Sequence, residues 1–262
     1  MNNSKPNLEK LTTQYYETFS ITGRFTGYFS NITIGDFYND LSATCHHPTG
    51  ILGGLNSTAR KEDVGVTNPE DLIAGTSSIV GKRGTENFGL AVFKEDKLCG
   101  KLTAMESVCH LLLQNKVDSC IVSIDNPIFE EEDKKMELQL FPRKNTKINV
   151  TIEDDSPHIT INLNLHADIM TLEKDVEYTT DEVLTKISNA TKDYLTQQFN
   201  NYLQKVSKEY ESDIDSFCTK ATANFLTIPD WENFNWNEKF KNSNFDVNID
   251  VNVLSTMLVT KT

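Results

Sequence analysis

Cysteine and histidine are contiguous at Cys45, His46 and His47, which places metal-binding and nucleophilic side chain types side by side. A thiolate and two imidazoles suit a transition metal, or a cysteine that a neighbouring base activates. Adjacent residues do not easily reach the same ion, however, and no HxxxH or HExxH spacing supplies further ligands. Two interpretations therefore stay open, a metal-binding or enzymatic site or a loop with solvated histidines, and the sequence favours the loop.

Two further pairs of ionisable residues raise the question of a shared metal ion or an acid–base pair. His158 and His166 fall on one face of a predicted strand, but eight residues of strand span roughly 26 Å, too far for one ion. We expect both rings to face solvent. Asp213 and Asp215 resemble a carboxylate pair for acid–base work, yet no third group or cleft is evident. The start of a helix is an equally suitable electrostatic environment for them.

The remaining candidates are explained by ordinary structure. The acidic clusters Glu130–Asp133 and Glu153–Asp155 lack the EF-hand ligand order, so we predict acidic turns. Trp231 and Trp236 are predicted to pack under the preceding loop rather than to stack on a ligand. We therefore assign no catalytic, cofactor-binding or metal-binding residue and expect no enzyme.

Composition narrows the possible partners. The 262 residues carry 25 basic and 38 acidic side chains, a net charge of −13, which argues against nucleic-acid binding and against electrostatic attachment to anionic lipid. No run approaches the roughly 20 apolar residues that span a bilayer. The N-terminus has no hydrophobic segment typical of a signal peptide.

The five cysteines are widely spaced and include no CxxC pair. An odd number at such spacing is a poor disulfide framework and is not a zinc pattern. Four of them lie inside apolar patterns and are expected to be buried as small hydrophobic side chains: Cys99, Cys109, Cys120 and Cys218.

The elements predicted from periodicity make an α+β protein, with a mostly antiparallel sheet packed against a long amphipathic helix. We expect a smaller N-terminal α+β domain over residues 1–85 and a C-terminal domain over 86–262. Residues 33–41 predict a short helix and 46–70 a loop. Four strands alternate apolar and polar residues: 120–124, 136–140, 148–152 and 159–165.

Helices and a last strand complete the predicted C-terminal domain. Thr103 and Glu106 form a capping box that predicts a helix start, and Thr179 and Glu182 have the same spacing. The other predicted elements, by range, are a hairpin at 88–100, the long helix at 180–207, a shorter helix at 212–225 and a strand at 245–253.

Several of these segments resemble the Ger(x)C family, the C subunits of spore germinant receptors. Residues 89–94 and 96–100 resemble the hairpin G-x-A-V-F-K-x-D-K-L-x-G, and Leu102 with Glu106 continues it. Residues 210–217 resemble the D-x-x-G segment, with Ser216 near the expected glycine. Trp231, Trp236 and Phe240 before residues 245–251 resemble the family's ending. The resemblance covers residues 86–262 well and 1–85 loosely.

The resemblance implies a non-catalytic receptor subunit that takes part in starting spore germination. It implies contacts with the integral-membrane A and B subunits, and attachment to the outward-facing side of the inner spore membrane through an N-terminal lipid anchor. This chain shows neither a signal sequence nor an acylation cysteine near its start. We therefore expect a soluble, shortened piece of a longer protein or a divergent full-length homologue. The alternative is a soluble metal-binding protein or enzyme centred on Cys45, His46 and His47.

Overall fold

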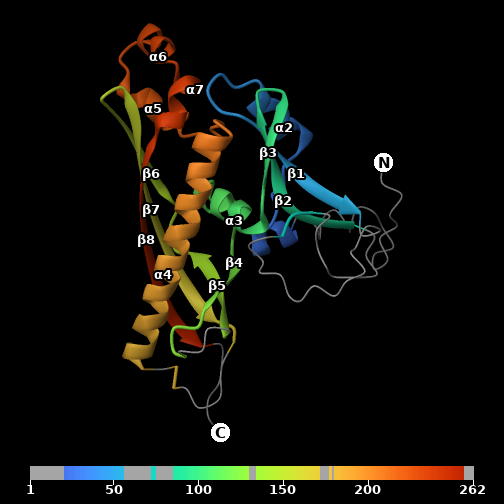
Figure 1. Cartoon of the computed structure of the whole chain (residues 1–262), viewed down its shortest axis with the longest axis vertical. Coiled ribbons are helices and arrows are strands. Elements are labelled where there is room, and N and C mark those ends of the chain that lie inside the picture. The colour runs from blue at the N-terminus through green and yellow to red at the C-terminus, as the bar shows by residue number, and fades with distance from the viewer. Residues whose placement is uncertain are drawn as a thin grey trace.

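A five-stranded sheet forms the larger part of the protein (Figure 1). The structure is a computed structural model, and it describes residues 21–55, 72–74, 85–129, 134–171, 177–178 and 180–256. The strands of this sheet are β4 (Cys120–Asp125), β5 (Lys135–Pro142), β6 (Lys147–Glu153), β7 (Ser156–Ile169) and β8 (Asn244–Thr256). Apolar residues at alternate positions of β4, β5 and β7 are buried, as the period of two predicts.

The long strand β7 organises the sheet. β5 and β6 pair with its two halves in antiparallel fashion, whereas β8 runs parallel to it along nearly its whole length. Parallel neighbours need a long crossover connection, and the helices between β7 and β8 supply it. The predicted α+β class with a mostly antiparallel sheet is confirmed.

Helix α4 (Asp181–Gln204) packs against β8 and is continued by a π-helical turn, Lys205–Glu209. Its buried stripe includes Ile187, Leu195 and Phe199, which follow the 3.6-residue period of an amphipathic helix. The predicted capping box at its start is wrong. Thr180 is the N-cap residue and makes no side-chain capping bond, and Thr179 lies outside the described residues.

Helix α3 (Ala104–Leu113) starts at the predicted capping box. The Thr103 backbone N–H donates to Glu106 Oε2 at 2.8 Å, and the Glu106 N–H donates to Thr103 Oγ1 at 3.3 Å. Lys205 donates to the same Glu106 carboxylate at 2.8 Å. This carboxylate therefore joins the start of α3 to the turn that follows α4.

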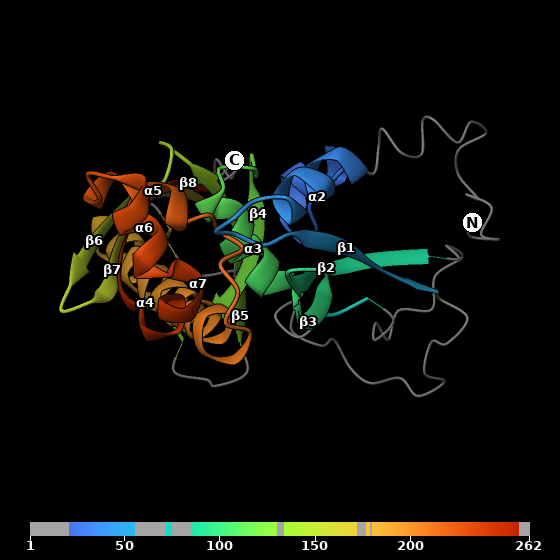
Figure 2. The ribbon, with the colours of Figure 1, turned by 90° about the horizontal axis from the view of Figure 1, so that it is seen from above.

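A second, three-stranded sheet extends away from the first, and α3 lies between them (Figure 2). Its strands are β1 (Thr49–Leu55), β2 (Thr85–Lys94) and β3 (Lys97–Leu102), in that order. The hairpin of β2 and β3 is confirmed, but the predicted loop over 46–70 is wrong for residues 49–55. Three glycines lower the strand propensity of β1, and its pairing with β2 overrides that local preference.

Two glycines of the hairpin motif occupy positions that a side chain cannot share. Gly89 has φ of +84°, and a Cβ there would lie 2.2 Å from the Leu102 carbonyl oxygen. A Cβ on Gly100 would lie 2.2 Å from the ring of Tyr210. Glycine at both positions lets β3 and the Tyr210 segment approach closely.

Several short helices lie around the two sheets. Helix α2 (Ile34–Leu41) is confirmed and has a capping box of its own, from Thr33 to Asp36. The others are α5 (Cys218–Ala221), α6 (Ile228–Phe234) and α7 (Trp236–Lys239), with 3₁₀ turns at Thr222–Asn224 and Phe240–Asn242. The predicted helix over 212–225 is wrong at its start, because residues 212–217 form a turn in which Ser216 has φ of 59°.

The division at residue 85 stays a prediction. β1 pairs with β2 across it, and a disulfide described below also spans it. Among the described residues, no helix combines the length and the apolar character that crossing a bilayer requires.

Candidate functional site

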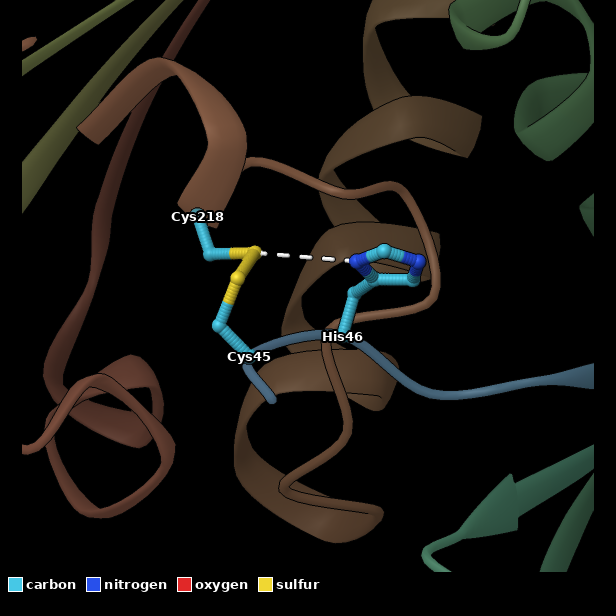
Figure 3. A group of neighbouring side chains, drawn as sticks. All are labelled: Cys45, His46 and Cys218. Carbon is cyan, nitrogen blue, oxygen red and sulfur yellow. Dashed lines mark hydrogen bonds between the residues drawn. A yellow bond between two sulfur atoms is a disulfide. The ribbon is translucent and has the colours of Figure 1, made fainter. Parts of the chain in front are cut away.

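A disulfide joins Cys45, just after α2, to Cys218 at the start of α5 (Figure 3). Their Cα atoms are 5.9 Å apart although the residues are separated by 173 positions. Cys218 is buried, as predicted, but the prediction from cysteine number and spacing that the chain has no disulfide framework is wrong. No local spacing encodes a pair this distant, because only the folded chain brings the two residues together.

The other cysteines divide between core and surface. Cys109 and Cys120 are free and fully buried, as predicted. Burial raises the pKa of the Cys120 thiol to about 12 and that of Cys109 well above its ordinary value. The prediction for Cys99 is wrong, because it is exposed on β3, the edge strand of the smaller sheet.

We expect the disulfide to contribute substantially to stability. Cross-linking residues this far apart restricts the unfolded chain, and typical disulfides contribute about 2–4 kcal/mol. The variant with both Cys45→Ser and Cys218→Ser should therefore lose about that much unfolding free energy, measured by urea denaturation. The control is Cys99→Ser on the exposed edge, which should change stability by less than about 0.5 kcal/mol. Equal stability of the double variant and wild type would contradict the expectation.

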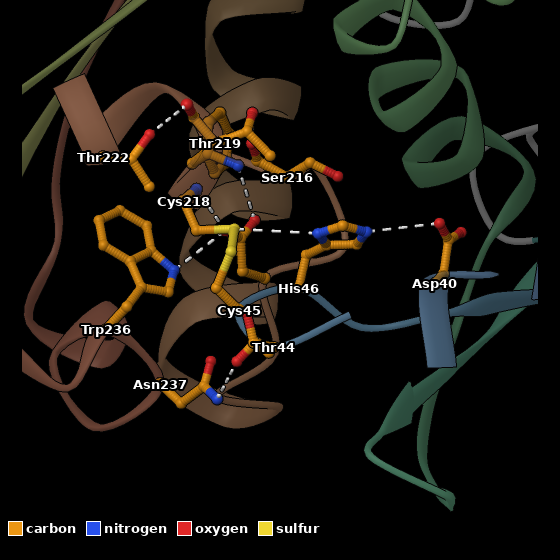
Figure 4. The surroundings of a disulfide bond; sticks show 12 residues. Asp40, Thr44, Cys45, His46, Ser216, Cys218, Thr219, Thr222, Trp236 and Asn237 are labelled. Atoms are coloured by element: carbon orange, nitrogen blue, oxygen red, sulfur yellow. Dashed lines mark hydrogen bonds and ion pairs between the residues drawn. A yellow bond between two sulfur atoms is a disulfide. The ribbon is translucent and has the colours of Figure 1, made fainter. Parts of the chain in front are cut away.

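His46 lies between the disulfide and a carboxylate (Figure 4). Its Nδ1 is 3.9 Å from Cys218 Sγ, and its Nε2 is 3.4 Å from Asp40 Oδ1 at the end of α2. The side chain is 19% exposed, so the prediction of a solvated histidine is wrong. The sulfur on one side and Asp40 on the other determine the orientation of the ring.

His47 is buried and takes no part in this group. Its backbone N–H donates to the Asp213 carbonyl at 2.9 Å, and burial lowers the pKa of its ring. Within the described part of the chain, the residues whose ligand atoms gather within 4.8 Å are Cys45, His46 and Cys218. The structure thus joins two of the three residues of the metal-site hypothesis, with Cys218 in the place of His47.

The side chain of Asp213 forms hydrogen bonds across the turn before α5. Its carboxylate accepts hydrogen bonds from the backbone N–H groups of Phe217 and Cys218, at 3.1 and 2.9 Å, and from Trp236 Nε1 at 3.0 Å. Burial, with a smaller contribution from the charge of Asp215, raises the pKa of the Asp213 carboxyl to about 7, although the three donors favour the ionised form. The carboxylate binds backbone N–H groups at the start of α5, which is consistent with the electrostatic role expected of it.

The raised pKa of Asp213 predicts a pH effect on stability. The folded chain holds this proton more tightly than the unfolded chain, so the contribution is complete below about pH 4 and is lost as the pH rises through about 7. The difference in unfolding free energy between wild type and Asp213→Asn should therefore shift against wild type between about pH 4 and 7. Urea denaturation at several pH values measures this shift. A constant or opposite trend would contradict it.

A second buried network connects α3, the turn before α5, and α4. Asp215 Oδ1 lies 2.8 Å from His110 Nδ1, and Tyr202 donates to Asp215 Oδ2 at 2.7 Å. Gln114 Nε2 donates to the Asp215 backbone carbonyl at 2.8 Å. Burial and the charge of Asp215 raise the pKa of Tyr202 well above its ordinary value. Asp215 is a candidate from the sequence, whereas the only local signal for His110 is a polar ring inside an apolar helix face.

A cavity of about 360 Å³ lies beside this network. His110 and Gln114 of α3 line it together with Asp36 and Asp40 of α2 and with Ser216. Within the described residues, the ring of His110 bonds to Asp215 and Tyr202, and the Tyr202 hydroxyl donates to Asp215 rather than to the histidine. The network therefore links α3 and α4 to the turn before α5 through buried hydrogen bonds.

The two sheet histidines occupy the outer face of β7, as predicted, and each is half-buried. His158 Nε2 lies 2.9 Å from Asp246 Oδ2, and the His166 ring stacks on Phe141 with centroids 4.8 Å apart. The two rings thus have separate partners and do not form a common site.

The acidic residues and tryptophans that were possible binding sites also have structural positions. Asp154 and Asp155 form the tight turn between β6 and β7 with positive φ angles. The ring centroids of Trp231 and Trp236 lie 6.0 Å apart, in a cluster with neighbouring phenylalanines. The cluster Glu130–Asp133 lies outside the described residues.

Comparison with known proteins identifies the fold and the family. No curated protein matches the sequence. A solved structure described as the crystal structure of the GerBC protein is similar, with a TM-score of 0.53 and 18% identity over 66% of this chain and 53% of that chain. The chain therefore spans about half the length of that structure, and the likeness concerns the fold.

The family comparison covers most of the C-terminal part. Residues 88–257 match the family described as Spore germination B3/GerAC like, C-terminal. This range runs from the β2–β3 hairpin to the end of β8, the same part in which the sequence motifs resemble the Ger(x)C family. That resemblance is confirmed, and the chain belongs to the spore germination B3/GerAC-like family.

Proposed function

We propose that the chain is the C subunit of a spore germinant receptor and takes part in starting germination without catalysing a reaction. The observation that carries the proposal is the family match over residues 88–257, which includes the hairpin, α3, the five-stranded sheet and α4. Attachment to the outer face of the inner spore membrane through an N-terminal lipid anchor is part of this proposal.

The distribution of polar groups supports a role in protein contacts. The buried carboxylates of Asp213 and Asp215 bond to groups of the chain itself, so they stabilise the scaffold. The outer face of strands β7 and β8 instead presents polar and acidic side chains, which are asparagine, aspartate, threonine and histidine. The partners we propose are the integral-membrane A and B subunits, and the net charge of −13 argues against nucleic acid.

Cross-linking in spores tests this proposal directly. An epitope-tagged chain, expressed in its full-length context and cross-linked in spores, should co-purify the integral-membrane A and B subunits. An equally abundant, unrelated lipoprotein of the same membrane, carrying the same tag, is the control. Spores that lack the gene should also respond more slowly to at least one nutrient, with recovery when the gene is restored. Failure to recover either subunit above the control would refute the assignment.

A metal-binding function is supported by a separate observation. The ligand atoms of Cys45, His46 and Cys218 lie together, whereas His47 is excluded from the group.

A further inference from the structure

We propose that the reduced chain binds one zinc ion through Cys45, His46 and Cys218, so that metal and disulfide are alternative links between the segment after α2 and the start of α5. The proposal is independent of the receptor assignment, because it depends on three side chains and their surroundings. Two of them precede the family-matched range 88–257 and the third lies within it.

The distances among these side chains suit a tetrahedral metal centre. Zinc binds thiolate sulfur at about 2.3 Å and imidazole nitrogen at about 2.0–2.1 Å, so neighbouring ligand atoms lie about 3.5–3.8 Å apart. His46 Nδ1 is already 3.9 Å from Cys218 Sγ. All three ligand atoms lie within 4.8 Å of one another. When the disulfide is opened, side-chain rotation has only to separate the two sulfurs to about 3.8 Å.

Replacing the disulfide by zinc requires that the sulfur–sulfur bond is first reduced. A dithiol or phosphine reductant supplies two electrons, and with two protons the disulfide becomes two thiols. Zinc then displaces both thiol protons and binds two thiolates, whose two negative charges neutralise the ion. His46 contributes the lone pair of Nδ1 and keeps its proton on Nε2. Water completes the fourth position.

Asp40 supports the histidine as an outer carboxylate. Its Oδ1 lies 3.4 Å from His46 Nε2, which is the nitrogen that carries the proton when Nδ1 binds metal (Figure 4). Histidine ligands to zinc usually donate their second N–H to such an acceptor, which selects the tautomer and orients the ring. The end of α2 thus provides a feature typical of zinc sites that the three ligands alone would not supply.

The backbone around Cys218 is held independently of the disulfide. Asp213 accepts a hydrogen bond from the Cys218 N–H at 2.9 Å, and Cys218 begins α5 within the buried core. This ligand therefore remains in place when the sulfur–sulfur bond opens. Cys45 lies on the half-buried segment after α2 and is the ligand whose movement accommodates the ion.

Metal titration of the purified chain tests the proposal. The chain is reduced with a phosphine, freed of metal and reductant without oxygen, and titrated with Co²⁺ and then Zn²⁺. We expect one equivalent to bind, with visible bands of tetrahedral cobalt and thiolate-to-cobalt charge-transfer bands that zinc abolishes. The oxidised chain should show neither band.

Variants separate the three-residue site from nonspecific binding by thiols. His46→Ala should weaken zinc binding about 100-fold, and Asp40→Asn about 10-fold. His158→Ala, which removes a histidine on the distant sheet face, should leave the affinity unchanged. Circular dichroism of each oxidised variant before reduction verifies its fold.

Three results would each overturn the proposal: no stoichiometric binding by the reduced chain, equal binding by the oxidised chain, or an affinity of His46→Ala equal to that of His158→Ala. The failure of metal binding would leave the receptor assignment intact, since that assignment depends on co-purification of membrane subunits.

Discussion

Replacing Ile161 by aspartate is expected to unfold the protein. Ile161 is fully buried in the middle of β7, where it lies opposite Ile148 of β6 on one side and Val247 of β8 on the other. A carboxylate at this position would be buried without a partner for its charge. The free-energy cost of burying an unpaired charge is large compared with the stability of a folded domain. Typical domains are stable by only about 5–15 kcal/mol in total.

The neighbouring residue provides the matched control. Asn162 belongs to the same strand but faces the opposite, polar side of the sheet. Asn162→Thr should change the unfolding free energy by no more than about 0.5 kcal/mol. Circular dichroism during heating distinguishes the two: Asn162→Thr should melt cooperatively near the wild-type temperature, and Ile161→Asp should show no cooperative transition. A normal melt for Ile161→Asp would refute the assigned strand face.

Removing the Asp215 carboxylate should have the second-largest effect. Asp215→Ala leaves the buried ring of His110 and the buried hydroxyl of Tyr202 without their shared acceptor. Breaking a buried, hydrogen-bonded pair of ionisable groups from one side typically costs about 3–5 kcal/mol. Tyr202→Phe removes one of the two bonds and should cost less, about 1.5–3 kcal/mol.

An exposed pair of the same residue types is the control for Asp215. Asp246 lies 2.9 Å from His158 on the outer face of the sheet, and its side chain is 61% exposed. Asp246→Ala should cost no more than about 1 kcal/mol, because solvent screens such pairs. Urea denaturation gives all three values. If Asp215→Ala were no more destabilising than Asp246→Ala, the buried network would not be the joint between α3 and α4 that its geometry indicates.

Local patterns explain which parts of the fold were predictable. The capping box of α3 lies within four residues, from Thr103 to Glu106, so the sequence alone reveals it. The alternation in β7 and the 3.6-residue period of α4 also repeat within short windows. The glycines of β1 resemble a loop, and its strand geometry comes from pairing with β2, whose partner residues are 30 to 43 positions away.

The residues of the candidate site come together only in the folded chain. Cys45 and His46 were recognised as possible ligands, but their partner Cys218 is 173 residues away and was expected to be an ordinary core residue. His110 was overlooked for a similar reason, since its partner Asp215 is 105 residues away. A window of sequence carries no sign of such pairs.

The amino-acid sequence by itself therefore determined the class of fold, the strands and the long helix of the large sheet, and the motifs of the germination family, because periodicity, capping and turn chemistry act between near neighbours. Tertiary structure alone decided that β8 runs parallel to β7, that a disulfide links the segment after α2 to the start of α5, and that His46 lies beside it. These features arise from contacts between distant segments, whose positions are set by the packing of the whole core.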